Sequence, residues 1–176
     1  MTTRRGMIET LLGLGAAGVL QSALDSTDWR AYEAVEETWI RDRHALLIRQ
    51  SPEAEAPAQI DLELKLAELQ RRAIQFKHLV KRNPRQLRGG VWQLSWLPFT
   101  EQEKLDLESA QPAYKRQERK IRELSQSLRE HADYDAFRRA QTHLWKTPEY
   151  KEIHRKYSGR MQELQNRRDP IDSHTR

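Results

Sequence analysis

The sequence predicts an all-α protein with four to six amphipathic helices, arranged as an elongated bundle or as helical hairpins. Three observations support this prediction. Apolar residues recur at spacings of three, four and seven over most of the chain. Only seven of the 176 residues are glycine. Charged residues make up 32% and apolar residues 37% of the chain, a balance that favours two-faced helices over a thick core.

The first helix of the body is expected in residues 25–50. The side-chain oxygens of Ser26, Thr27 and Asp28 suit a helix start, because they accept hydrogen bonds from the free N–H groups of the first turn. The apolar stripe of this helix consists of Trp29, Tyr32, Val35, Trp39 and Leu46. Residues 51–57 contain two prolines and predict a linker.

The second helix has the most regular pattern in the chain. Its apolar residues step alternately by four and three, which predicts a helical hairpin or a short coiled coil; they are Leu62, Leu66, Leu69, Ala73, Phe76 and Val80. Asn83 and Pro84 end it, since the residue before proline avoids helical angles. An extended, tryptophan-rich loop is predicted for residues 84–99, where alternating residues would share one face.

Further helices are predicted after this loop. Thr100 and Glu103 have the spacing of a capping box. Pro112 interrupts the helix that they begin, and a break is expected near Asp133. Thr147 and Pro148 begin the last helix, with proline in its first turn. Residues 169–176 predict a disordered tail. The tryptophans Trp29, Trp39 and Trp145 are expected in the core.

The N-terminal 24 residues differ from this helical domain, which we assign to residues 25–168. Two arginines precede an uncharged run from Thr10 to Leu24. The stretch Thr3-Arg4-Arg5-Gly6-Met7-Ile8 resembles a twin-arginine export signal, although Glu9 stands where lysine is common. This resemblance implies export of the folded protein, with Arg4 and Arg5 as the recognised pair.

The length of the uncharged run limits what it can do if it is not cleaved. Fifteen helical residues span about 22 Å, whereas the hydrocarbon core of a bilayer is about 30 Å thick. We therefore expect residues 1–24 to be an export signal or a short membrane anchor. The protein is then placed at the periplasmic face of the bacterial inner membrane.

Charge is segregated along the chain. Residues 25–64 carry a net charge of −6, residues 65–100 of +7, and residues 101–176 of +3. Three interpretations remain open: pairing between an acidic first helix and a basic second one, binding to an anionic membrane surface, and binding to nucleic acid. The net charge of only +5 and the expected export make nucleic acid the least favoured. The candidate residues for an anionic surface are Arg71, Arg72, Lys77, Lys81, Arg82, Arg85 and Arg88.

Motifs for catalysis or metal binding are missing from the sequence. There is no cysteine, and none of the six histidines has the spacing of a helical metal site. The pair Gly89 and Gly90 lacks the remainder of a phosphate-binding loop. We therefore expect no catalytic residue, no metal and no cofactor.

The tryptophan-rich loop provides the candidate residues for binding a protein partner, because exposed aromatic side chains often anchor interfaces. These residues are Trp92, Leu94, Trp96 and Phe99. A lid over the protein's own core is the alternative role of this loop.

These features favour a non-enzymatic structural or assembly subunit of a membrane-bound complex of redox or photosynthetic type. Its expected partners are protein subunits of that complex and the membrane surface. The first alternative is a free periplasmic helical chaperone or stress protein. Residues 99–102 are the nearest match to the motif of the LTxxQ-type periplasmic family, and the match occurs once. The second alternative is a cytoplasmic nucleic-acid-binding or ribosome-associated protein.

Overall fold

The protein is all-helical in the part of the chain that the structure describes. This computed structural model describes the backbone of residues 9–82 and 100–166, with side chains for residues 29–78 and 100–164. Within these ranges it contains six α-helices and no strand, which confirms the predicted fold class. The helices are α1 (Glu9–Gln50), α2 (Glu55–Arg82), α3 (Glu101–Ala110), α4 (Pro112–Glu130), α5 (Tyr134–Leu144) and α6 (Pro148–Asn166).

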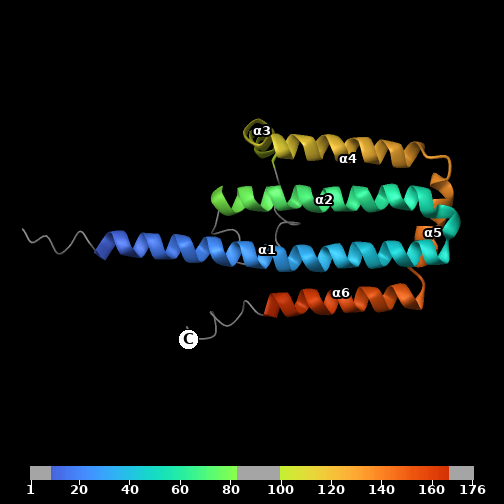
Figure 1. Cartoon of the computed structure of the whole chain (residues 1–176), viewed down its shortest axis with the longest axis horizontal. Coiled ribbons are helices and arrows are strands. Elements are labelled where there is room, and N and C mark those ends of the chain that lie inside the picture. The colour runs from blue at the N-terminus through green and yellow to red at the C-terminus, as the bar shows by residue number, and fades with distance from the viewer. Residues whose placement is uncertain (1–8, 83–99, 167–176) are drawn as a thin grey trace, which may run out of the picture.

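The four long helices form an open layer. They lie side by side in the order α4, α2, α1 and α6, and each is antiparallel to its neighbour (Figure 1). Helices α1 and α2 form a helical hairpin, one of the two arrangements predicted for the second helix, with the short 3-10 helix η1 (Pro52–Ala54) at the turn. The short helix α5 covers one end of the layer, and the N-terminal part of α1 extends beyond the other end (Figure 1).

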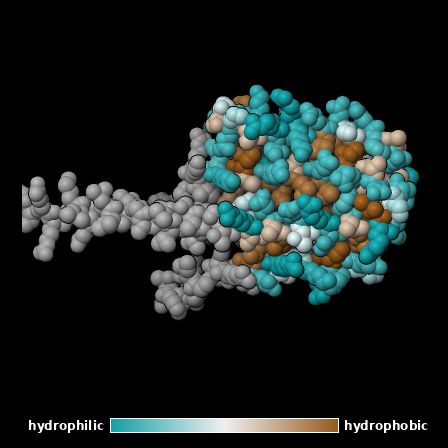
Figure 2. Space-filling view, viewed as in Figure 1, coloured by the Kyte–Doolittle hydropathy of each residue, from teal (hydrophilic) through white to brown (hydrophobic). Residues whose placement is uncertain are grey.

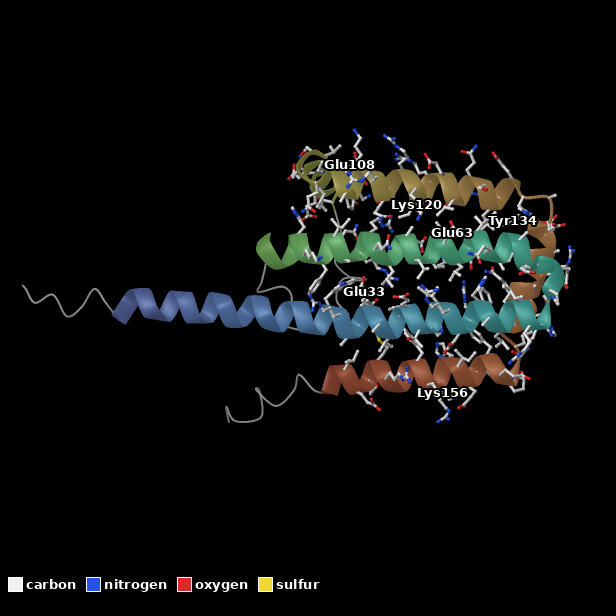
Figure 3. The ribbon with its side chains drawn as sticks, in the orientation of Figure 1. Glu33, Glu63, Glu108, Lys120, Tyr134 and Lys156 are labelled. Carbon is white, nitrogen blue, oxygen red and sulfur yellow. The ribbon has the colours of Figure 1, made fainter. Side chains whose placement is uncertain are left out.

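Two apolar clusters hold the layer together. The cluster near α5 joins residues of α1, α2, α4 and α5 around Leu47, Phe137 and Leu144. The cluster at the other end joins Trp29 and Tyr32 of α1 to Phe76 of α2. Because the layer has two open faces, many other apolar side chains are only half-buried. Figure 2 shows them between rows of polar residues, and Figure 3 shows side chains in the spaces between neighbouring helices.

Several helix boundaries were predicted correctly. Thr100 caps α3, where its hydroxyl accepts a hydrogen bond from the N–H of Glu103 and the carboxylate of Glu103 accepts one from the N–H of Thr100. The break before Pro112 separates α3 from α4. The predicted break at Asp133 precedes α5, and Thr147 accepts a hydrogen bond from Tyr150 at the start of α6.

The start of the first helix was predicted wrongly. No helix begins at Ser26, Thr27 or Asp28, because α1 runs without interruption from Glu9 to Gln50. Inside a continuous helix the backbone carbonyls satisfy the N–H groups that a cap would otherwise serve. The predicted linker is also shorter than expected, since α2 already begins at Glu55 and Pro57 is fully buried.

One of the three tryptophans expected in the core lies on the surface. Trp29 is buried and Trp39 is half-buried, whereas 53% of Trp145 is exposed. Trp145 directly follows the last residue of α5, where the neighbouring Leu144 takes the buried position. The expectation for Trp145 is therefore wrong.

Candidate functional site

A buried carboxylate lies where α1, α2 and α6 meet. Glu36 of α1 accepts hydrogen bonds at Oε1 from the hydroxyls of Tyr32 and Tyr157, both at 2.8 Å. The guanidinium of Arg72 lies 3.8 Å from the same oxygen and donates a hydrogen bond of 3.0 Å to the hydroxyl of Tyr32. These four side chains are called the Glu36 cluster below, and they connect the three helices through polar contacts.

Aromatic rings surround the Glu36 cluster. Trp29 stacks on Phe76 of α2 with the ring centroids 5.0 Å apart, and it contacts the ring of Tyr32 at 5.2 Å. On the other side of α1, Trp39 contacts the ring of Tyr157 at 5.1 Å. The polar contacts of Glu36 are therefore made in a largely apolar environment, where an unpaired charge is costly.

The environment of the Glu36 cluster changes the acidity of its phenols. Burial raises the pKa of Tyr32 and of Tyr157, and the negative charge of Glu36 raises both further. Arg72 acts in the opposite direction on both groups. The two phenols therefore stay protonated well above the usual tyrosine pKa and remain hydrogen-bond donors to Glu36.

A second buried ionic contact joins α1 to α2 near the α5 end. Arg43 of α1 donates a hydrogen bond of 2.5 Å to Asp61 of α2, and Gln141 of α5 donates to the same carboxylate at 3.4 Å. Burial raises the pKa of Asp61, although Arg43 opposes this shift. Burial lowers the pKa of His44, and the charge of Asp61 opposes that shift.

Both buried clusters connect helices, and neither has the composition of a metal site. Within the described ranges no group of three or more His, Asp or Glu side chains could hold a metal ion. The hollow beside the Glu36 cluster, between Trp39 and Tyr157, has a volume of only about 90 Å³. The chemistry of these clusters is that of donors and acceptors paired between helices.

The predicted anionic-surface residues that can be described are partly used inside the fold. Arg71 pairs with Glu118 of α4 at 3.1 Å, and Arg72 belongs to the Glu36 cluster. Lys77 is exposed. Of these three side chains, only Arg72 therefore pairs with the first helix as that interpretation expects, whereas Arg71 pairs with α4. The side chains of Lys81 and Arg82, and all of Arg85 and Arg88, lie outside the described residues.

A cationic surface that the sequence analysis missed runs along α4. Residues 115–122 carry five basic side chains and one acidic one, Glu118, which pairs with Arg71. The basic residues have no ion pair within the part of the chain that the structure describes, and we call them the α4 basic surface: Lys115, Arg116, Arg119, Lys120 and Arg122. Five cations in eight residues were visible in the sequence.

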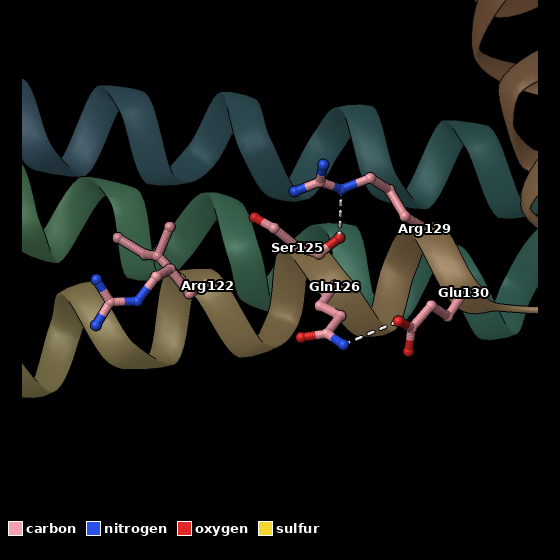
Figure 4. A pocket seen from close by; sticks show the side chains of 6 residues that line it. Arg122, Ser125, Gln126, Arg129 and Glu130 are labelled. Atoms are coloured by element: carbon pink, nitrogen blue, oxygen red, sulfur yellow. Dashed lines mark hydrogen bonds between the residues drawn. The ribbon is translucent and has the colours of Figure 1, made fainter.

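A shallow hollow of about 490 Å³ adjoins this surface (Figure 4). Its polar side chains are engaged along α4 itself, since Arg129 donates to the carbonyl of Ser125 at 3.1 Å and Gln126 donates to Glu130 at 2.9 Å. Arg122 lies apart from these contacts in the close view. The hollow is therefore part of a solvated helix face.

A second exposed basic surface covers α5 at the end of the layer. Five side chains line an open hollow of about 410 Å³, namely Arg138, Arg139, Thr142, His143 and Lys146. All five are exposed, and the exposed Trp145 lies among them in the sequence. This α5 surface combines positive charge with the exposed aromatic ring.

The remaining predicted site residues cannot be placed. Arg4 and Arg5 of the export signal lie outside the described residues, as do Trp92, Leu94, Trp96 and Phe99. Comparisons of the chain with family models, with curated proteins and with solved structures find no match.

Proposed function

We propose that this protein is a non-enzymatic structural or assembly subunit of a membrane-bound complex, of redox or photosynthetic type. It is held at the extracytoplasmic face of the bacterial inner membrane. Protein subunits of that complex are its main partners, and the membrane surface is the second.

The observation that carries the proposal is the continuity of α1. The uncharged run from Thr10 to Leu24 belongs to the same helix that lies between α2 and α6 in the layer. An attachment made by this run is therefore transmitted directly to the folded body. Among the described residues no helix is both long enough and apolar enough to span a bilayer. We accordingly propose that the run packs at the membrane interface or against membrane-embedded subunits.

The distribution of charge supports attachment at the same end. The α2 segment from Lys77 to Arg82 has three basic and no acidic residues. Helix α2 lies beside the α4 basic surface, as the contact between Gln75 and Tyr114 indicates. This segment and the α4 basic surface lie at the end from which the N-terminal part of α1 extends (Figure 1). Helix α3 is acidic, so the positive charge at this end is concentrated on α2 and α4. Each Lys or Arg near an anionic headgroup surface contributes about 1 kcal/mol of attraction.

The buried contacts suit a scaffolding role. The Glu36 cluster fixes α6 and α2 against α1, and the Arg43–Asp61 pair fixes the opposite half of the hairpin. A rigid layer with two accessible faces presents preformed surfaces to partners and keeps the entropic cost of docking low.

The export part of the proposal is tested by replacing Arg4 and Arg5 together with lysine. We expect the variant to accumulate in the cytoplasm, because the twin-arginine pair is the recognised element. The matched control replaces the exposed Arg30 and Arg49 with lysine, which keeps the charge and leaves the N-terminus intact. Fractionation and immunoblotting measure the distribution. Unchanged membrane localisation of the first variant would contradict the export assignment.

A further inference from the structure

The α5 surface has cations that the fold itself does not use. The ion pairs of the described residues include none of Arg138, Arg139 and Lys146. Their positive charge is therefore available to an external group. By contrast, Arg71 and Arg72 on α2 are engaged with carboxylates of neighbouring helices.

An exposed aromatic side chain shares a helix face with one of these cations. Arg138, Thr142 and Trp145 follow one another at spacings of four and three residues, which places them on the same side of α5. Trp145 and Leu105 of α3 are the large apolar side chains that are exposed in the described part of the chain. Tryptophan and arginine are the residues most enriched among those that dominate interface energies.

The opposite side of α5 is firmly packed. Phe137 and Leu144 are almost completely buried in the cluster that joins α5 to α1, α2 and α4. At the end of α5 the hydroxyl of Thr147 donates a hydrogen bond of 2.8 Å to the carbonyl of Leu144. The backbone that presents Arg138 and Trp145 is thus held in place before any partner binds, which lowers the ordering cost of association.

We propose that the α5 surface docks an acidic segment of a partner protein, with Trp145 as the apolar anchor. Arg138, Arg139 and Lys146 pair with carboxylates of that segment, and the open hollow beside them receives its side chains. This inference rests on the proposed function, because it specifies how the subunit contacts its complex.

The position of the α5 surface favours a protein over the membrane. Helix α1 rises about 38 Å between Asp25 and Gln50, at 1.5 Å per residue. The α5 end therefore lies far from the end proposed for attachment (Figure 1). Nucleic acid fits less well, because its binding depends on how many phosphates Lys and Arg side chains neutralise, and only three permanently charged residues line the hollow.

The test is photo-cross-linking of the full chain in its native cells. Trp145 is replaced by the photoreactive residue p-benzoylphenylalanine, and the cross-linked peptides are identified by mass spectrometry. We expect a protein adduct that maps to a segment rich in Asp and Glu. The same replacement at Leu105 is the matched control position, since that side chain is also large, apolar and exposed. It should not give the same adduct.

Charge reversal tests the electrostatic part of the inference. In the Trp145 photoreactive chain, Arg138→Glu together with Arg139→Glu should lower the adduct yield by at least about tenfold, the factor that a loss of about 1.4 kcal/mol in binding free energy gives. Changing the partner's carboxylates to lysines should restore it. The control pair Lys151→Glu and Arg160→Glu makes the same charge change at exposed positions of α6, outside both basic surfaces, and should leave the adduct in place. Circular dichroism of each variant verifies that helicity is retained.

Several results would overturn the inference. The first is an adduct with lipid, with nucleic acid or with a second copy of the chain. The second is a protein adduct whose yield does not change on charge reversal. The third is the absence of any adduct in cells that accumulate normal amounts of the protein. Fractionation of the same cells separates the two proposals. An acidic-segment adduct formed in the cytoplasm would contradict the membrane location alone, whereas loss of the adduct at an unchanged membrane location would contradict the docking surface alone.

Discussion

Replacing Glu36 with alanine should destabilise the protein far more than the same replacement of an exposed acidic residue. The change removes the acceptor for the hydroxyls of Tyr32 and Tyr157 and leaves Arg72 without its carboxylate. A buried polar group without a partner costs about 1–3 kcal/mol, and breaking a buried ion pair costs about 3–5 kcal/mol. Arg72 and Tyr157 can partly turn to solvent, since both are only half-buried. We therefore expect a loss of about 3 kcal/mol in the free energy of unfolding.

Glu37 is the matched control, because it is the next residue of the same helix. Its ion pair with Arg41 measures 2.7 Å, and the two side chains are 42% and 56% exposed. Exposed pairs of this kind contribute about 0.3–0.5 kcal/mol. Because both variants gain the same helix propensity of alanine, the difference between them isolates the buried contacts.

Urea unfolding of both variants, followed by circular dichroism and by tryptophan fluorescence, measures this difference. For a chain of this size a loss of 3 kcal/mol corresponds to a fall in Tm of about 6–12 °C. The reasoning would be refuted if Glu36→Ala lost no more stability than Glu37→Ala. That result would mean that the Glu36 cluster does not hold α6 and α2 against α1.

Two further predictions follow from the buried groups. The pKa values of Tyr32 and Tyr157 are raised in the folded protein, so the unfolded chain loses these two phenolic protons at lower pH. The free energy of unfolding should therefore fall as the pH rises above about 10. Absorbance at 295 nm should show that these tyrosines ionise late, and ionisation of all tyrosines at the usual pH would contradict this prediction. Asp61→Ala should cost about 3 kcal/mol, because it leaves the buried Arg43 without its partner. The exposed Asp42→Ala should cost little in the same urea unfolding experiment, and equal losses would count against a structural role of the Arg43–Asp61 pair.

The parts of the fold set by local chemistry could be predicted from the sequence. A capping box, a proline in a first turn and a seven-residue apolar repeat act within a few residues, so Thr100, Pro112 and Pro148 mark real helix boundaries. The prediction of a helix start at residues 26–28 was wrong, because a capping side chain matters only where a helix begins. Helix α1 already passes through them from Glu9.

The contacts between helices could not be predicted in the same way. Glu36 finds one partner four residues away, but its other partners, Arg72 and Tyr157, are brought to it only by the order of the helices in the layer. The exposure of Trp145 likewise depends on Leu144 taking the buried position at the end of α5. The α4 basic surface, in contrast, is a local run of charge that the sequence already contained.

The central claim is that this protein is a stoichiometric subunit of a membrane complex. It is tested most directly by native purification of the full chain through a C-terminal tag from detergent-solubilised membranes, with mass spectrometry of the co-migrating proteins. We expect co-migration with a large membrane complex in a fixed ratio. Recovery as a lone soluble species would contradict it, and would direct attention to the chaperone and nucleic-acid alternatives.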